Sequence, residues 1–99
     1  MRLSDQAREI IRRTTQEVFG PDAEVLIFGS RVIDSVRGGD IDLLVRLPRV
    51  TEDTRRKSLQ LTARLQRRLG DQRIDVLVID PQTPPTPIYT EALRTGELV

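Results

Sequence analysis

The sequence contains no cysteine and no histidine. Without cysteine the chain can form neither a disulfide nor a thiolate metal site, which is consistent with a reducing cytoplasm. Because imidazole is missing as well, a metal site in this chain would have to be built from oxygen ligands, which suit Mg²⁺ or Mn²⁺.

Aromatic residues, net charge and long apolar runs are also scarce. Aromatic residues make up 3% of the chain and tryptophan is absent, so we expect an aliphatic core of Val, Ile and Leu. Charged residues reach 31%, but the net charge of +1 does not predict polyanion binding by bulk charge. No apolar run approaches the length needed to span a membrane, and the N-terminal residues lack an apolar signal region. The length of 99 residues predicts one domain, residues 1–99, located in the cytoplasm without membrane association.

Three short apolar runs predict strands, and acidic residues lie on two of them. The first run is unbroken, as expected for a strand that is buried on both faces. The second carries Asp40 and Asp42 at alternate positions, so both carboxylates point to one face. The third carries Asp75. If the runs pair in one sheet, the three acids converge beside Gly29-Ser30, which follows the first run. The runs are residues 25–28, 41–45 and 74–79.

Such a group of carboxylates has a chemical consequence. Two carboxylates about 5 Å apart repel by roughly 3 kcal/mol at an effective dielectric constant near 20, so the group should bind a cation or a proton. Two divalent ions roughly 4 Å apart can clamp the attacking and leaving oxygens of a displacement at phosphorus. A group formed by Asp40, Asp42 and Asp75 would suit two such ions, Mg²⁺ or Mn²⁺. The alternative is that these acids face water at a strand edge.

Gly29-Ser30 could supply the phosphate contacts of this chemistry. A glycine after a strand allows backbone N–H groups to approach a phosphate, and Ser30 could open a short helix through about Val36. Taken alone, a Gly-Ser pair is usually only a turn. The combination with an in-strand Asp-Ile-Asp and a later in-strand aspartate is much more specific and predicts phosphoryl or nucleotidyl transfer.

The pattern Gly29-Ser30 followed by Asp40-Ile41-Asp42 resembles the DNA polymerase β-like nucleotidyltransferases, in particular the minimal nucleotidyltransferase group. The resemblance extends from Val25 to Gly96. It implies an α+β fold in two layers, a small mixed sheet of three to four strands covered by helices. It also implies that Asp40, Asp42 and Asp75 are catalytic metal ligands, and that Gly29, Ser30 and Arg31 contact the nucleotide.

The resemblance further implies a partner and an activity. Members of this group are often antitoxins encoded beside a helical HEPN-type toxin, so we expect AMP transfer from ATP to a hydroxyl group, a tyrosine of such a toxin, within a hetero-oligomer. Members often continue Gly-Ser-Arg with Ala-Arg-Gly, whereas Val32-Ile33 follows Arg31 here. An alternative is therefore a catalytically weak or inactive antitoxin that neutralises its partner by binding, in a complex that could also bind operator DNA. Transfer to RNA or to a small molecule is a third possibility.

Helical spacing predicts three helices around the strands. The first begins after Ser4 and ends at Gly20-Pro21, and the last begins with Thr86-Pro87 and runs through about Thr95. The middle helix is expected over residues 51–69, with Glu52 and Asp53 in its first turn. Its expected apolar side consists of Leu59, Thr62, Leu65 and Leu69.

Two sets of basic residues have alternative interpretations. Arg73 shares a face with Asp75, so it is expected to pair with the acids when metal is absent, and a structural role is as plausible as a catalytic one. The basic residues of the middle helix either form a solvated surface or contact an acidic partner or nucleic acid. They are Arg55, Arg56, Lys57, Arg64, Arg67 and Arg68.

Overall fold

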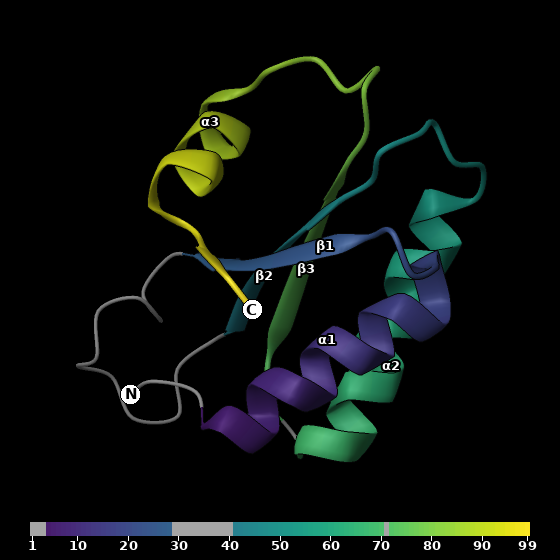
Figure 1. The fold of residues 1–99 in the computed structure, drawn as a ribbon, viewed down its shortest axis with the longest axis vertical. Coiled ribbons are helices and arrows are strands. Elements are labelled where there is room, and N and C mark those ends of the chain that lie inside the picture. Colours follow the sequence, from purple (N-terminus) through teal and green to yellow (C-terminus); the bar gives the residue numbers. More distant parts are fainter. Residues whose placement is uncertain (1–3, 29–40, 71) are drawn as a thin grey trace.

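In the part of the chain that the structure describes, four strands form one mixed sheet in the order β3-β2-β1-β4 (Figure 1). In this computed structural model, which describes residues 4–28, 41–70 and 72–99, β1 pairs antiparallel with both β2 and β4, while β2 and β3 are parallel. The strands are β1 (Glu24–Phe28), β2 (Ile41–Arg46), β3 (Ile74–Ile79) and β4 (Glu97–Leu98). The helices are α1 (Asp5–Phe19), α2 (Thr54–Leu69) and α3 (Pro87–Thr95).

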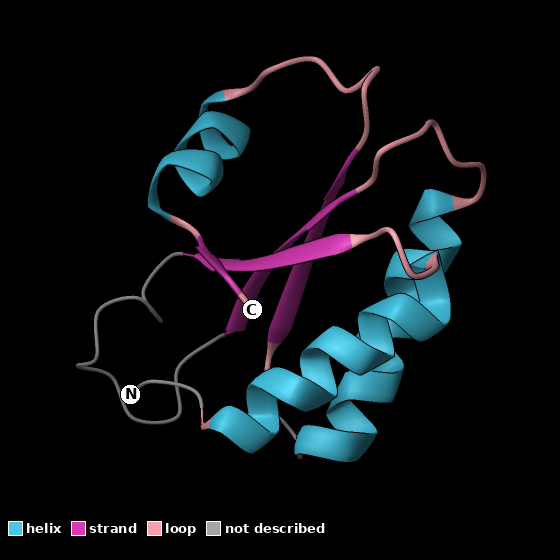
Figure 2. Ribbon diagram, in the orientation of Figure 1, coloured by secondary structure: helices cyan, strands magenta, loops and turns pink. Residues whose placement is uncertain are grey.

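The helices divide between the two faces of the sheet. Figure 2 shows α1 and α2 side by side, with the strands between them and α3. Alternate strand residues pack under α1 and α2 with Ile11, Leu61 and Leu65 in the larger apolar cluster. The other strand residues form a smaller cluster with Ala92 of α3. The strands are therefore buried on both faces, which explains their unbroken apolar runs. The prediction of an α+β fold with a mixed sheet of three to four strands is confirmed.

The predicted ends of α1 and α3 are also confirmed. The Ser4 hydroxyl accepts a hydrogen bond of 3.1 Å from the Ala7 N–H, which satisfies one of the free donors in the first turn of α1. The Thr86 hydroxyl caps α3 in the same way, accepting from Tyr89 N at 3.2 Å, and Pro87 is the first helical residue. At the end of α1, Gly20 has a φ of 103°, a conformation that favours glycine.

The prediction for α2 is wrong at its beginning and for one residue of its buried side. Leu65 is buried and Leu69 packs against the core, as predicted, but Leu61 rather than Leu59 enters the core. The helix begins at Thr54, so Glu52 and Asp53 precede it, and Asp53 adopts the left-handed conformation at the N-cap. Leu59 is 64% exposed, whereas Leu61 and Leu65 are completely buried. Both leucines pack in the larger apolar cluster. The side of α2 that is buried is set by the surfaces that the helix packs against.

Acidic side chains of α1 neutralise part of the basic surface of α2. The carboxylate of Glu17 lies 3.3 Å from Arg64 Nη1 and 3.0 Å from Arg68 Nη2. The hydrogen bond from Arg68 lowers the pKa of Glu17 below its ordinary value. Arg68 also donates to the buried Thr14 hydroxyl at 2.7 Å. With the Arg56–Asp53 pair at 3.4 Å, these contacts favour the interpretation of a solvated, internally paired surface.

Candidate functional site

Asp42 and Asp75 lie side by side on one face of the sheet. Asp42 is paired with Asp75 in the parallel β2–β3 register, and Phe28 of β1 is opposite Asp42 on its other side. Neighbouring strands are about 4.8 Å apart, so the two carboxylates belong to one site. The predicted convergence of these two acids is confirmed.

The face that carries the two acids is identified by their neighbours along the strands. Leu44 follows Asp42 by two residues and packs in the α3 cluster, and Leu77 follows Asp75 in the same way. Side chains two residues apart on a strand share a face, so both carboxylates project on the α3 side. Ile41 and Ile74 point to the opposite face and are buried under α1 and α2. Burial of these isoleucines therefore orients the acids.

The carboxylates remain accessible at this end of the sheet. The Asp75 side chain is 55% exposed and Asp42 is half-buried. Phe28, also half-buried, adds an apolar side chain directly beside Asp42. The sequence placed Phe28 at the end of a strand, but its position opposite Asp42 depends on the antiparallel register and had no sequence signal.

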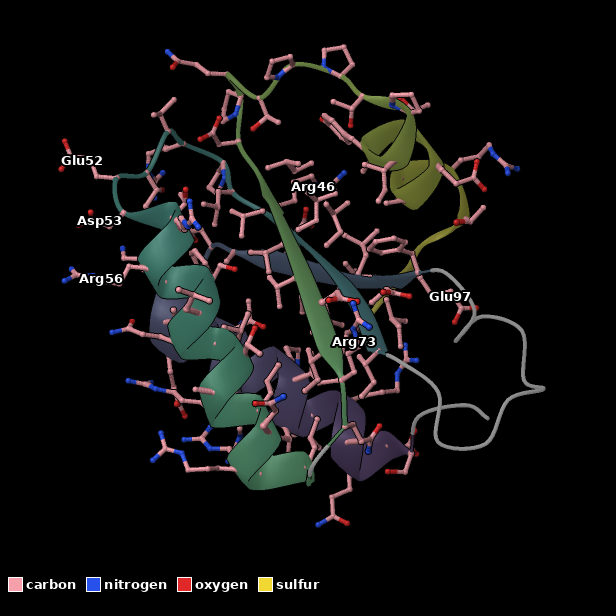
Figure 3. All side chains as sticks on the ribbon, turned by 180° about the vertical axis from the view of Figure 1, so that it is seen from behind. Arg46, Glu52, Asp53, Arg56, Arg73 and Glu97 are labelled. Carbon is pink, nitrogen blue, oxygen red and sulfur yellow. The ribbon has the colours of Figure 1, made fainter. Side chains whose placement is uncertain are left out.

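Arg73 pairs with the acidic site, as the sequence predicts. Its Nε atom lies 3.6 Å from Asp75 Oδ2, and its side chain is 73% exposed. Figure 3 shows Arg73 beside β3 with carboxylate oxygens drawn near its guanidinium group. The arginine directly precedes β3, which begins at Ile74.

The other predicted site residues lie outside the described residues. They are Gly29, Ser30 and Arg31, predicted to contact the nucleotide, and Asp40, the first acid of the Asp-Ile-Asp pair. In sequence, Gly29 directly follows the last residue of β1 and Asp40 directly precedes the first residue of β2. The predicted short helix from Ser30 to about Val36 also lies outside the described residues. The roles of Gly29, Ser30, Arg31 and Asp40 therefore remain predictions.

The described donors fit a divalent cation that prefers oxygen. Within residues 4–28, 41–70 and 72–99, no three acidic side chains lie close enough to hold a metal by themselves. Mg²⁺, however, usually takes only one or two protein carboxylates, the remaining ligands being water and substrate phosphates. Asp42 and Asp75 satisfy that requirement and could hold such an ion.

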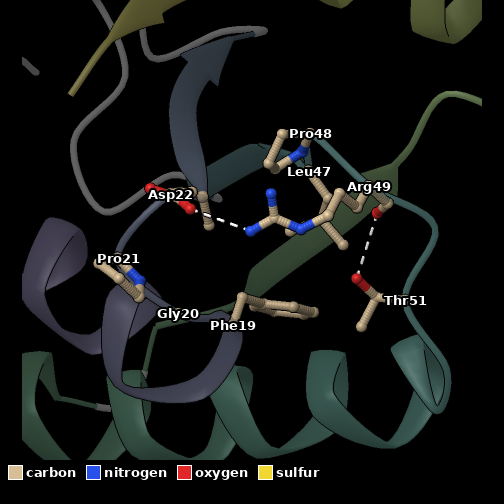
Figure 4. Close-up of a pocket in the computed structure, with 9 residues that line it drawn as sticks. Phe19, Gly20, Pro21, Asp22, Leu47, Pro48, Arg49 and Thr51 are labelled. Atoms are coloured by element: carbon tan, nitrogen blue, oxygen red, sulfur yellow. Dashed lines mark hydrogen bonds and ion pairs between the residues drawn. The ribbon is translucent and has the colours of Figure 1, made fainter.

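A depression at the opposite end of the sheet is not part of this site. It has a volume of about 70 Å³ and lies between the end of α1 and the segment after β2 (Figure 4). An ion pair of 3.0 Å between Arg49 and Asp22 crosses it. Thr51 donates a hydrogen bond of 3.2 Å to the Arg49 carbonyl. These contacts join the two loops, and the depression contains no residue of the acidic pair.

Among the described helices, none is both long enough and apolar enough to cross a bilayer.

Most of the chain is similar to one known protein family. The model of a family described as nucleotidyltransferase domain matches residues 6–94. None of the curated protein sequences is significantly similar to the chain.

Three similar solved structures are toxin–antitoxin complexes. The first is a toxin–antitoxin with AMP-PNP, with a TM-score of 0.70 and 19% sequence identity. The match covers 92% of this chain and 70% of the chain in that structure. The second is the toxin–antitoxin MntA-HpeT carrying two Asp-to-Glu substitutions, with a TM-score of 0.67 and 18% sequence identity. The match covers 93% of this chain and 70% of the other chain. The third is a tri-AMPylated HEPN toxin from Shewanella oneidensis in complex with an MNT antitoxin, with a TM-score of 0.58 and 17% sequence identity. The match covers 92% of this chain and 70% of the other chain. At these identities the likeness shows the fold.

Proposed function

The chain belongs to the nucleotidyltransferase domain family, and from this premise we propose that it transfers AMP from ATP to a hydroxyl group in the presence of Mg²⁺. One observation carries the proposal. Asp42 and Asp75 are register partners on neighbouring parallel strands, and both side chains project on the same face. Two unrelated surface acids would have no reason to be register partners with side chains on the same face of the sheet.

The residues have distinct parts in the proposed reaction. Asp42, Asp75 and Asp40 would hold one or two Mg²⁺ ions, which neutralise the triphosphate and polarise its α-phosphorus. Gly29, Ser30 and Arg31 would contact the phosphates. The acceptor oxygen forms a bond to the α-phosphorus, the bond to the β-phosphate oxygen breaks, and pyrophosphate leaves. A carboxylate oxygen of Asp75 takes the proton of the attacking hydroxyl.

A protein hydroxyl is the proposed acceptor. The similar structures include one HEPN toxin that is tri-AMPylated and in complex with an MNT antitoxin, and one toxin–antitoxin with the ATP analogue AMP-PNP. These descriptions support ATP as the donor and a HEPN-type toxin as the acceptor for this chain. A tyrosine hydroxyl as the modified group is what the family resemblance implies. The protein would then work in a hetero-oligomer, as an antitoxin that modifies its partner.

The test is an incubation with labelled ATP, Mg²⁺ and the product of the adjacent gene, followed by intact-mass measurement. We expect the partner to gain the mass of one or more AMP groups, and Asp42→Asn to abolish the gain. Glu24→Gln is the matched control, since it makes the same change at the other end of the same sheet face, where Glu24 pairs with Arg46 at 2.6 Å. An Asp42→Asn variant with undiminished transfer would refute the assignment.

Neutralisation by binding alone is the second candidate function. Apolar side chains on and after α3 favour it, because Ile88 and Leu98 are 59% and 58% exposed and Leu93 is 37% exposed. Large apolar side chains that remain exposed near one element can contribute to a protein interface. A stable complex without any mass increase would support this function over AMP transfer.

A further inference from the structure

The backbone of Arg73, the residue before β3, is hydrogen-bonded to the start of β2. Its backbone carbonyl accepts a hydrogen bond of 2.9 Å from the N–H of Ile41, the residue that directly precedes Asp42. Its side chain projects on the same face as Asp75, which lies two residues further along the chain. The strand pairing therefore places a positive charge at the edge of the carboxylate pair.

The contact between Arg73 and Asp75 has the geometry of a displaceable ion pair. The Nε–Oδ2 distance is 3.6 Å, and the two side chains are 73% and 55% exposed. Exposed pairs of this kind contribute little to stability. The guanidinium can consequently leave the carboxylate without disturbing the fold.

We propose that Arg73 is a built-in counter-cation, which neutralises Asp42 and Asp75 before metal arrives and competes with the divalent ion for Asp75. This inference rests on the proposed function, because it assumes that these two carboxylates bind the metal. A guanidinium within 4 Å of a metal-binding carboxylate lowers the affinity for a cation in two ways. It lies 3.6 Å from an oxygen of the carboxylate that the metal would need, and it repels the incoming charge.

The counter-cation sets the order of binding at the site. Mg²⁺ without nucleotide must displace Arg73 and binds weakly. When the nucleotide is present, its phosphates offer the displaced guanidinium a new partner, since arginine forms strong charge-assisted contacts with phosphate. Metal and nucleotide therefore favour each other's binding, and the site resists loading by metal alone.

The proposal can be tested without any measurement of activity by titrating the protein with Mn²⁺ alone. The electron paramagnetic resonance signal of the unbound ion then gives the dissociation constant. We expect Arg73→Gln to bind Mn²⁺ about three- to tenfold more tightly than the wild type at physiological ionic strength, the range that loss of one nearby positive charge gives. The difference should shrink in high salt, which screens exposed charges. Arg73→Lys, which keeps the charge, should remain closer to the wild type.

The matched control is Arg46→Gln. Arg46 is an exposed arginine on the same face of the sheet, four residues beyond Asp42 on β2, and it forms an ion pair of 2.6 Å with Glu24. Four strand residues span about 13 Å, more than a Debye length at physiological ionic strength. We expect less than a twofold change in Mn²⁺ affinity for this variant. Figure 3 labels both arginines.

The outcomes separate the inference from the function on which it rests. If Asp42→Asn loses Mn²⁺ binding but Arg73→Gln binds no more tightly than the wild type, the counter-cation is refuted and the metal site stands. If neither the wild type nor Arg73→Gln shows Mn²⁺ binding that Asp42→Asn removes, both are refuted. Equal tightening by Arg73→Gln and Arg46→Gln would indicate a general charge effect and would also overturn the proposal.

Discussion

Binding of Mg²⁺ between Asp42 and Asp75 should stabilise the folded protein, and Asp42→Asn should remove that stabilisation. The two residues are register partners on adjacent strands, which are about 4.8 Å apart. Two unit charges about 5 Å apart repel by about 0.8 kcal/mol in surroundings that resemble water. The aqueous value applies because the Asp75 side chain is 55% exposed. We therefore expect metal-free Asp42→Asn to lie within about 1 kcal/mol of the wild type in free energy of unfolding.

The effect of the metal is larger than this repulsion. A site with a dissociation constant of about 1 mM gains about 1.4 kcal/mol in about 10 mM Mg²⁺, because the ion binds only the folded state. For a domain of this size, that gain raises Tm by roughly 6–11 °C. The wild type should show this rise, Asp42→Asn should show none, and Glu24→Gln should behave as the wild type.

Thermal unfolding followed by circular dichroism, with and without Mg²⁺, measures these differences. The isosteric change to asparagine keeps the side-chain volume, so a loss of the rise reports on charge and ligation at the site. The reasoning is refuted if Asp42→Asn retains the full rise in Tm. It also fails if the rise disappears equally in Glu24→Gln, whose carboxylate lies at the far end of the sheet.

Two further predictions concern the scaffold of the site. Leu61→Ala should lower the free energy of unfolding by about 3 kcal/mol, because the side chain is completely buried, whereas exposed Leu59→Ala should change it by less than about 0.5 kcal/mol in denaturant titrations. The opposite ranking would show that α2 packs in the phase expected from the sequence. Gly96→Ala should cost about 2 kcal/mol in the same titrations, since a Cβ atom there would lie 2.5 Å from the Ala92 carbonyl oxygen and 3.3 Å from Leu26 Cβ. Unchanged stability of Gly96→Ala would contradict this close approach.

Local sequence signals account for most element boundaries. Ser4 and Thr86-Pro87 were sufficient to place the starts of α1 and α3, because a capping side chain acts on the next three residues only. The apolar runs likewise identified β1, β2 and β3. The two-residue strand β4 was not located, since a strand of this length has no periodicity of its own and exists by pairing with β1.

For the two described acids of the candidate site, the sequence predicted the face of each strand but not their pairing. Asp42 alternates with apolar residues along its strand, which established that its carboxylate points to the face opposite theirs. The same holds for Asp75. The sequence could not establish that the two are register partners, because register between distant strands is set by the helix that joins them and by the core that they share. The role of Arg73 depends on the same pairing.

The sequence by itself determined the family, the strand and helix segments, and the acidic residues that project from the strands. These follow from spacing and capping, which act over a few residues. Tertiary structure decided which strands are neighbours, that Leu61 rather than Leu59 enters the core, and that Arg73, Asp75 and Asp42 form one cluster. Each of these outcomes depends on the free energy of burying apolar surface between segments far apart in the chain, and no local pattern records that energy.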